Sequence, residues 1–390
     1  MKLWDRYPDQ NIIPFQTQVE HYWQKAISKA KRLMGLFGLK SKSIQTDPDY
    51  SVQDYDQTIT NYSTKRILKN APFTPDAIIV LFMQNFLSYK NLHELNQLTK
   101  APVFLYMMDM APMTGGCHYA WDCKGYTGMC GKCPALYSKV ENDQSRKNWE
   151  FKKYYVDKTD LTIIAGTEYQ FRQLEKSSLF AQKRKAKILL GINPELFKPG
   201  SQSEARKLFD LPLKTKIIFF GAVSAGNKRK GFNELVKALN LLKTNNPDLE
   251  LHLAIAGNAN EQLTNNLPYS YTLIGYLNHE KLAKAFQAAD LFLCPSIEDS
   301  GPMMINQSIM TGTPVVAFEM GVALDLVITV ETGYRAKLKD TDDMVEGIRQ
   351  ILELNENEYI TMKSKCRNLG LRLCSPNAQS VNFNNIIMSI

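Results

Sequence analysis

The sequence predicts an α/β protein with two Rossmann-like domains, whose parallel sheets face each other across a cleft. Short apolar runs recur in both halves of the chain without polar alternation, which is typical of parallel strands covered on both faces. Stretches of helical periodicity separate these runs, and such alternation produces right-handed crossovers and doubly wound sheets. The length of 390 residues suits two or three domains.

The first domain is predicted to span residues 1–199. An opening strand with a glycine-rich loop is not evident near the N-terminus, so we expect this domain to lack both. The buried strands are expected at 77–83, 102–107, 161–165 and 186–190, and helices at 143–156 and 167–176.

The second domain is predicted to follow the linker-like Pro199-Gly200-Ser201 and to span residues 200–370. Residues 371–390 are expected to form a tail that packs back on the first domain. Ligands of doubly wound sheets bind at the carboxyl ends of the strands, so the cleft is the expected binding site. The strands are expected at 216–220, 251–256, 291–294 and 314–318, and helices at 232–243, 279–288 and 340–354.

Composition limits the location and the partners. The chain contains no apolar run of about 18 residues and no apolar signal core, so we expect a cytoplasmic protein without a spanning helix. The net charge of +8 favours an anionic partner. Phosphorylated small molecules, a membrane surface and nucleic acid all meet that description.

Residues 22–42 have the pattern of a basic amphipathic helix. An apolar stripe from Trp23 to Phe37 recurs at spacings of three and four, and cations line a neighbouring face. Such a helix either lies on an anionic membrane surface or packs its stripe against the sheet of the first domain.

A first candidate site lies at 221–231, GAVSAGNKRKG, between a predicted strand and a predicted helix. Glycines permit a close backbone approach to a ligand, and the helix N-terminus supplies free N–H groups. Lys228, Arg229 and Lys230 add cations that suit a diphosphate. The alternative is a solvated basic turn. The string matches neither the Walker pattern nor the G-x-G-x-x-G pattern.

A second candidate site lies at 295–318, PSIEDSGPMMINQSIMTGTPVVAF. Glu298 and Asp299 follow a predicted strand, and Gly301-Pro302 opens a predicted helix that ends near Gly312. Glu298 either caps this helix or accepts hydrogen bonds from sugar hydroxyls.

A third candidate site lies at 109–133, DMAPMTGGCHYAWDCKGYTGMCGKC, where four of the seven cysteines crowd together. Four thiols can enclose a tetrahedral zinc ion, although only one Cys-x-x-Cys pair is present. The alternative is a buried, reduced loop whose thiols fill small apolar spaces. Both interpretations stay open for Cys117, Cys123, Cys130 and Cys133.

Together with ILLGINPELFKPG at 188–200, these segments resemble glycosyltransferase family 4, in particular its bacterial polysaccharide-building branch. The resemblance runs from about residue 76 to 354. It implies the glycosyltransferase-B fold and transfer of a sugar, with retention, from a nucleotide-diphosphate sugar to a glycan or lipid-linked acceptor. No cofactor is then required for catalysis, and nucleic acid is not an expected partner. A lipid-linked acceptor favours peripheral attachment to the inner face of the cytoplasmic membrane through residues 22–42.

On the donor side, the resemblance implies that Arg229 and Lys230 bind the diphosphate and that the backbone at Gly301 approaches it. Glu298 falls on the first glutamate of the family's two-glutamate motif, which contacts the donor sugar. Gln307 replaces the second glutamate of the motif, and in the family that glutamate contacts the ribose.

On the acceptor side, Asp109 and His118 belong to a loop that faces the cleft. The predicted catalytic residues are therefore Glu298, Asp109 and His118. The family's usual His-Asp pair appears here as Met108-Asp109, which removes one imidazole.

The two-glutamate motif also departs from the family pattern. Gln307 lies one residue further from Glu298 than the two glutamates of the family lie from each other. With the family's spacing, Asp299 rather than Glu298 would be the first acid of the motif. Glu298 remains the predicted contact with the donor sugar. Two other functions stay open: a nucleotide-sugar-binding or scaffold protein without turnover, and a phosphorylase of the same fold.

Overall fold

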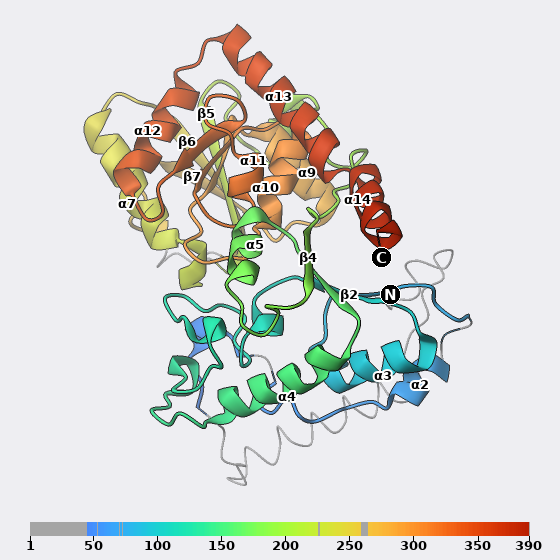
Figure 1. The fold of residues 1–390 in the computed structure, drawn as a ribbon. Coiled ribbons are helices and arrows are strands. Elements are labelled where there is room, and N and C mark those ends of the chain that lie inside the picture. The colour runs from blue at the N-terminus through green and yellow to red at the C-terminus, as the bar shows by residue number, and fades with distance from the viewer. Residues whose placement is uncertain are drawn as a thin grey trace, which may run out of the picture.

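The computed structural model describes residues 45–52, 54–69, 71, 73–224, 227–258 and 264–389. The predicted basic helix at 22–42 lies outside these residues. The described chain forms two α/β lobes, the first below and the second above in Figure 1. Each lobe holds a parallel sheet, as the sequence predicts; the sheet of the first lobe has the expected four strands, and that of the second has six, two more than expected.

The sheet of the first lobe has the order β1-β2-β3-β4 and is parallel throughout. Alternate side chains of β2 enter different clusters, because successive residues of a strand point to opposite faces. Val103 and Leu105 pack with Trp149 of α4, whereas Phe104 and Tyr106 pack on the other face. The elements are α2 (Thr64–Lys69), β1 (Ile78–Val80), α3 (Tyr89–Thr99), β2 (Val103–Met107), α4 (Gln144–Lys158), β3 (Leu161–Ala165), α5 (Glu168–Glu175) and β4 (Arg184–Lys187).

Both edges of this sheet differ from the expected runs. The apolar run 77–83 forms only the short strand β1, and the following Leu81 and Phe82 are 49% and 63% exposed. The expected strand at 186–190 is shifted: β4 begins earlier, at Arg184, and is only partly buried, whereas Ile188 and Leu189 follow the strand and are buried as expected. β1 is an edge strand that lacks a neighbour on one side, which explains why its apolar run overstates its burial.

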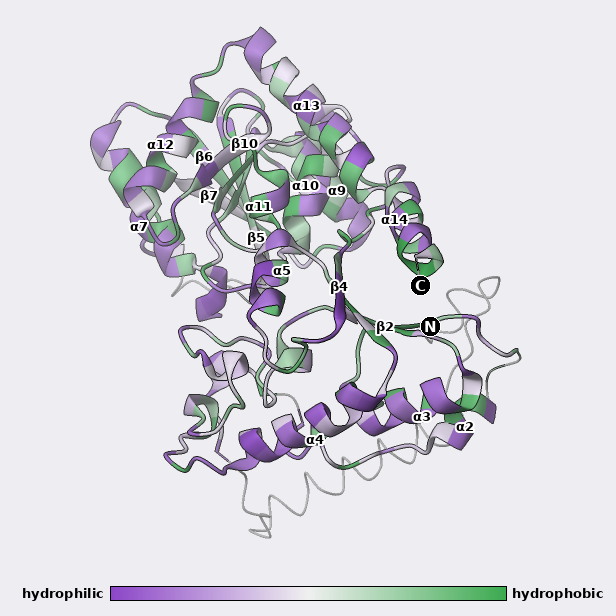
Figure 2. Ribbon diagram, viewed as in Figure 1, coloured by the Kyte–Doolittle hydropathy of each residue, from purple (hydrophilic) through white to green (hydrophobic). Residues whose placement is uncertain are grey.

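The sheet of the second lobe has the order β10-β9-β8-β5-β6-β7, again parallel throughout. Phe219, Phe286 and Phe292 form an aromatic cluster in its core, with ring centroids 5.1–5.6 Å apart. Hydrophobic residues follow the strands in Figure 2. The elements are α6 (Gln202–Leu208), β5 (Lys216–Ser224), α7 (Phe232–Asn245), β6 (Leu251–Asn258), β7 (Ser270–Gly275), α9 (His279–Ala288), β8 (Leu291–Cys294), α10 (Met303–Thr311), β9 (Val315–Phe318), α11 (Ala323–Leu326), β10 (Gly333–Ala336) and α12 (Thr341–Leu352).

The C-terminal helices connect the two lobes. Helix α13 (Glu356–Cys374) packs on α10 of the second lobe, and α14 (Pro376–Met388) follows it. Phe383, Ile386 and Ile387 of α14 pack against the face of the first sheet that is opposite α4 (Figure 1). None of the helices in the described part of the chain is both long and apolar enough to cross a membrane.

Candidate functional site

The basic turn Lys228–Lys230 joins β5 to α7 in the second lobe. The side chain of Asn227 accepts a hydrogen bond from Arg229 N at 3.1 Å, and the Arg229 carbonyl accepts one from Ile297 N at 2.9 Å. The turn is therefore docked against the loop that follows β8, so the first and second candidate sites of the sequence form one site.

Gly231 makes this docking possible. Its φ of +68° is in the left-handed region, and an added Cβ would lie 1.7 Å from Pro295 O. Only glycine adopts this φ without strain and leaves room for the backbone of Pro295.

We expect Gly231→Ala to lower the free energy of unfolding by at least about 2 kcal/mol and to displace the basic turn. Gly275→Ala is the matched control, because Gly275 also has a φ of +68° but nothing within 4 Å of an added Cβ. The control is expected to lose about 1 kcal/mol. Chemical denaturation of both variants measures the difference, and equal losses would show that the contact with Pro295 is unimportant.

Asp299 lies between the two cations of this turn. Its Oδ2 is 2.6 Å from Lys230 Nζ and 3.4 Å from Arg229 Nη1, and its Oδ1 accepts a hydrogen bond from Gly301 N at 3.1 Å. All three charged groups are largely shielded from water, which strengthens their attraction. Asp299 thus holds both cations in place, and an anionic ligand at this turn would compete with it.

Glu298 precedes Asp299 and is also buried. Burial, followed by the neighbouring charge of Asp299, raises the pKa of the Glu298 carboxyl to about 7, although the Arg229 guanidinium opposes this shift. Arg229 also donates a hydrogen bond to the backbone carbonyl of Glu298 at 3.1 Å. The Glu298 carboxyl therefore changes protonation near neutral pH.

Gly301 lies two residues before α10, and Gln307 lies in the interior of this helix. An added Cβ at Gly301 would lie 2.9 Å from Thr167 of the first lobe, and Thr167 donates a hydrogen bond to Ser300 O at 2.8 Å. The two lobes are therefore in close contact at Gly301. Gln307 is buried within α10.

A cavity of about 370 Å³ lies between the lobes, which is within the range of small-ligand sites. Sequence reasoning missed most of its lining, because these residues come from three separate segments. The cysteine-rich loop contributes aromatic rings, α5 contributes cations, and the segment after β9 contributes an acid. The lining includes Trp121, Lys124, Tyr126, Tyr169, Arg172, Lys176 and Glu319.

Asp109 and His118 lie together in the first lobe, as the sequence suggests. Asp109 follows β2, and its Oδ2 is 2.6 Å from His118 Nδ1. Its Oδ1 accepts a hydrogen bond from Ala111 N at 2.8 Å, and Gln170 donates one to its backbone carbonyl at 3.2 Å. These contacts fix the carboxylate and orient the imidazole, whose Nε2 is on the far side of the ring.

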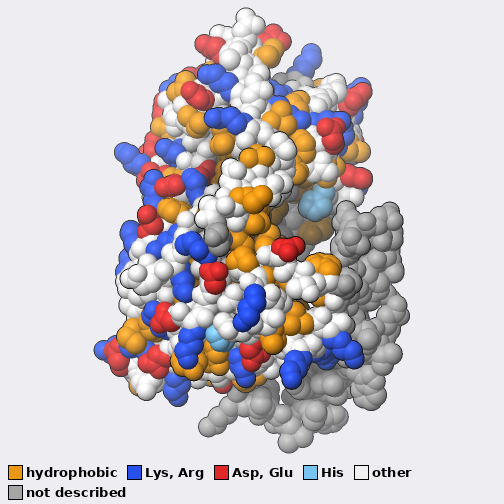
Figure 3. Space-filling model, turned by 45° about the vertical axis from the view of Figure 1, so that its right-hand side comes forward, with side chains coloured by type: hydrophobic (Ala, Val, Ile, Leu, Met, Phe, Trp, Pro, Cys, Tyr) orange, Lys and Arg blue, Asp and Glu red, His pale blue; other side chains and the backbone are white. Residues whose placement is uncertain are grey.

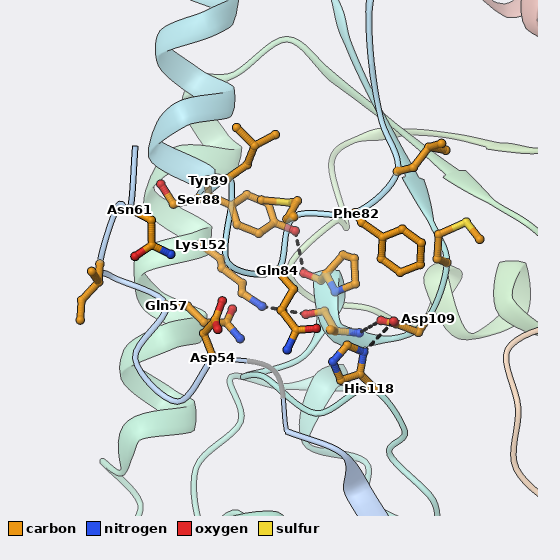
Figure 4. A pocket seen from close by; sticks show the side chains of 17 residues that line it. Asp54, Gln57, Asn61, Phe82, Gln84, Ser88, Tyr89, Asp109, His118 and Lys152 are labelled. Atoms are coloured by element: carbon orange, nitrogen blue, oxygen red, sulfur yellow. Dashed lines mark hydrogen bonds and ion pairs between the residues drawn. The ribbon is translucent and has the colours of Figure 1, made fainter. Parts of the chain in front are cut away.

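This pair lines a pocket of about 40 Å³. In Figure 4 the polar ends of Asp54, Gln57, Gln84, His118 and Lys152 gather around one space. Apolar side chains, including the exposed Phe82, complete the lining.

Lys152 is the buried cation of this pocket, with 1% of its surface exposed. Burial lowers the pKa of its ammonium to about 8. Its Nζ donates hydrogen bonds to Ala111 O at 2.7 Å and Thr114 O at 2.8 Å. Two of its three protons therefore hold the loop that carries His118.

The cysteine-rich loop, residues 109–137, connects the pocket to the basic turn. Next to His118, the ring of Tyr119 lies 3.7 Å from the Arg229 guanidinium carbon. The Nζ atom of Lys228 lies 5.2 Å from the centroid of the Trp121 ring. The candidate donor and acceptor residues thus meet along one loop.

The four clustered cysteines line one cavity beneath this loop, and all are free. Burial raises the pKa of Cys117 to about 12 and that of Cys130 to about 11. Within the described residues, no three Cys, His, Asp or Glu side chains already stand in positions that could hold a metal ion.

The second lobe is similar in sequence to known proteins. Residues 202–368 match the family model for glycosyl transferases group 1. D-inositol 3-phosphate glycosyltransferases from Corynebacterium aurimucosum and Corynebacterium diphtheriae are each 26% identical to the chain. The matches cover 51% and 55% of this chain and 50% and 52% of those proteins. The chain thus spans about half the length of these curated relatives.

Solved structures match most of the chain. Sucrose-phosphate synthase from Thermosynechococcus elongatus has a TM-score of 0.61 at 18% identity, covering 84% of this chain and 77% of that one. Anabaena HepE, solved in complex with UDP, has a TM-score of 0.59 at 14% identity, covering 80% and 79%. The fold is therefore that of the glycosyltransferase-B enzymes.

Proposed function

We propose that the chain is a retaining glycosyltransferase that moves a sugar from a nucleotide-diphosphate donor to a hydroxyl of a glycan or lipid-linked acceptor. The observation that carries this proposal is the basic turn Lys228–Lys230, docked beside the acidic loop and in contact with Tyr119 of the first lobe. The complex of Anabaena HepE with UDP supports a nucleotide donor for this fold. A role in cell-surface polysaccharide synthesis is part of the proposal and rests on the sequence resemblance.

In this proposal, the basic turn stabilises the leaving group. Negative charge develops on the diphosphate as the bond to the sugar breaks, and preorganised cations favour that state. Arg229 and Lys230 are held in place before the donor arrives, because Asp299 and the ring of Tyr119 fix them. The donor diphosphate then replaces Asp299 as their main counter-charge.

Glu298 is proposed to contact the donor sugar. A buried carboxylate accepts hydrogen bonds from sugar hydroxyls, and its charge strengthens them. Gln307 offers an uncharged amide oxygen in place of the family's second glutamate, so we expect a weaker contact with the ribose. The contact between the lobes at Gly301 excludes water from the diphosphate and limits donor hydrolysis.

The pocket of Asp109 and His118 is proposed to bind the acceptor. Its described lining has the carboxylates of Asp54 and Asp109, whereas the ammonium of Lys152 is already bonded to two carbonyls. Such a lining favours uncharged hydroxyls over phosphate, because an added anion would face two carboxylates. We therefore propose an acceptor that is neutral at the attacking end.

His118 is proposed to accept the proton of the attacking hydroxyl. Asp109 holds Nδ1 and fixes the tautomer, so the lone pair of Nε2 can face the acceptor. This arrangement of a base oriented by a carboxylate is common in acid–base catalysis.

A combined binding and transfer assay tests the proposed function. We expect UDP-, GDP- or ADP-sugars to raise the melting temperature, and mass spectrometry to detect sugar transfer to neutral glycosides. Nucleotide binding without hydrolysis or transfer would instead identify a binding or scaffold protein. Release of sugar 1-phosphate from a glycan by inorganic phosphate would identify a phosphorylase. Absence of nucleotide binding would overturn the proposal.

Peripheral membrane attachment is a separate proposal, and it rests on the sequence of residues 22–42 alone. We expect the full chain to co-sediment with anionic vesicles at low salt and to be released at high salt, because exposed charges are screened. Neutral vesicles are the control. Protein that stays in the supernatant with anionic vesicles at low salt would show that the stripe packs within the protein instead.

A further inference from the structure

The cysteine-rich loop is long and has little regular structure. Between β2 and α4 the described chain forms only three short 3-10 turns, Ala111–Met113, Gly125–Thr127 and Pro134–Leu136. Loops of this length rarely hold one conformation without an added constraint. This loop nevertheless carries the side chains of His118, Tyr119 and Trp121, which must be held accurately.

The thiols of Cys117, Cys123, Cys130 and Cys133 line one cavity of about 30 Å³ inside this loop. The cavity has room for a single ion or water molecule but not for an organic cofactor. At Gly125, an added Cβ would lie 3.4 Å from Cys123 Sγ and 3.6 Å from Cys130 Sγ. These two sulfurs therefore both lie close to the same glycine.

Backbone N–H groups are directed at three of the four sulfurs, those of Cys123, Cys130 and Cys133. Gly115 N donates to Cys130 Sγ at 3.2 Å, and Gly125 N donates to Cys123 Sγ at 3.4 Å. The amides of Ala135 and Leu136 donate to the Cys133 thiol. Hydrogen bonds of this kind stabilise negative charge on sulfur, which is the form that binds a metal. Thiols that only fill apolar space have no need of them.

The Cys-Gly-Lys-Cys turn is held in a conformation that the chain disfavours. Cys130, Gly131 and Lys132 have φ values of 56°, 94° and 46°, so three consecutive residues are left-handed. Arg146 donates to Cys130 O at 3.0 Å, and Asp143 accepts from Cys133 N at 2.8 Å. Strain that the surroundings enforce in this way is typical of functional sites.

We propose that Cys117, Cys123, Cys130 and Cys133 bind one structural zinc ion, which holds the cysteine-rich loop between the two candidate substrate sites. The sulfurs do not stand at coordinating positions in this structure, so zinc binding requires the loop to rearrange around the cavity that the four cysteines line. A Cys₄ set without a free position suits a structural ion. The ion would fix the backbone next to His118 and Tyr119 without touching either substrate.

Metal analysis of protein purified under reducing conditions with zinc supplied tests this proposal. We expect about one zinc per chain in the wild type and a strong loss in each of C117S, C123S, C130S and C133S. C294S is the matched control, since Cys294 is a buried thiol outside the cluster, and it should keep the zinc. Zinc absent from folded wild-type protein, or lost equally in the control, would overturn the proposal.

Two measurements on the wild type remain informative if the serine variants fail to fold. Cobalt supplied in place of zinc should give the absorption bands of a tetrahedral thiolate site. Removal of the zinc by a chelator should lower the melting temperature, and added zinc should restore it. Absence of the cobalt bands would overturn the proposal. None of these readouts depends on glycosyl transfer, so the zinc site and the proposed function can fail separately.

Discussion

The double variant R229A/K230A is expected to bind nucleoside diphosphates much more weakly than the wild type, while its affinity for the free nucleoside changes little. Each side chain would make a charge-assisted hydrogen bond to the diphosphate, and the loss of one such bond costs about 1.5–3 kcal/mol. Each single substitution should therefore weaken binding roughly 10- to 150-fold. Calorimetry with UDP, GDP or ADP and the matching nucleoside measures both effects.

Arg349→Ala is the matched control for this experiment. Arg349 of α12 forms ion pairs with Glu346 of the same helix and with Glu353, which directly follows it, so its removal changes the net charge of the same lobe away from the basic turn. We expect its diphosphate affinity to stay within about twofold of the wild type, because exposed charges at a distance are screened. Equal losses for nucleoside and diphosphate in R229A/K230A would rule out a diphosphate site at this turn.

The contact between Asp299 and the basic turn could not be predicted from sequence. The pattern placed Glu298 and Asp299 on one loop and Arg229 and Lys230 on another, and the family resemblance favoured Glu298 as the contact with the donor sugar. In the structure both cations lie at the carboxylate of Asp299. Which of two adjacent acids points toward a partner depends on the path of the backbone, and local sequence does not determine that path.

The central strands of both sheets could be predicted well. Strands β3 and β8 match the expected ranges 161–165 and 291–294, because both are buried on each face and read as continuous apolar runs. Strands β7 and β10 were missed. They are edge strands, and β7 alternates between exposed and half-buried residues without a clear apolar run.

The acceptor-side pocket shows another limit of sequence reasoning. Asp109 and His118 were identified through the family resemblance of their loop, but Asp54 and Gln84 were not, because they lie in other segments that the resemblance does not mark. The segments around Asp54 and Gln84 reach the pocket only through long-range packing: Asn85 N donates to Asp54, and Gln57 N donates to Asn148 of α4.

Apolar side chains gather in the hollow that Figure 3 shows between the two lobes, and no single segment predicts that arrangement.

Glu298→Gln is expected to lower transfer and raise stability at the same time. If the charged carboxylate contacts the donor sugar, its loss removes a charge-assisted hydrogen bond and slows transfer roughly 10- to 150-fold. Wild-type kcat/KM should also rise with pH through about 7, as the free-enzyme carboxyl ionises, and this dependence should disappear in the variant.

The stability effect follows from the same burial. Because the folded-state pKa of Glu298 is raised to about 7 from 4.5, protonation favours folding. That contribution is fully present below about pH 4.5 and is lost as the pH rises through 7. At pH 8 the buried charge then costs up to about 3 kcal/mol, which glutamine removes. We expect E298Q to melt higher than the wild type at pH 8, with the difference shrinking towards pH 5.

Calorimetric melting curves of E298Q at pH 5 and pH 8, beside transfer assays at pH 8, test both effects. E331Q is the control, because Glu331 is an exposed carboxylate of the same lobe and should change neither quantity. Wild-type turnover in E298Q would remove Glu298 from the site. Lower transfer together with lower stability at pH 8 would instead identify Glu298 as a residue that supports the fold. Only a loss of transfer with a gain in stability indicates a buried charge that is kept for its function.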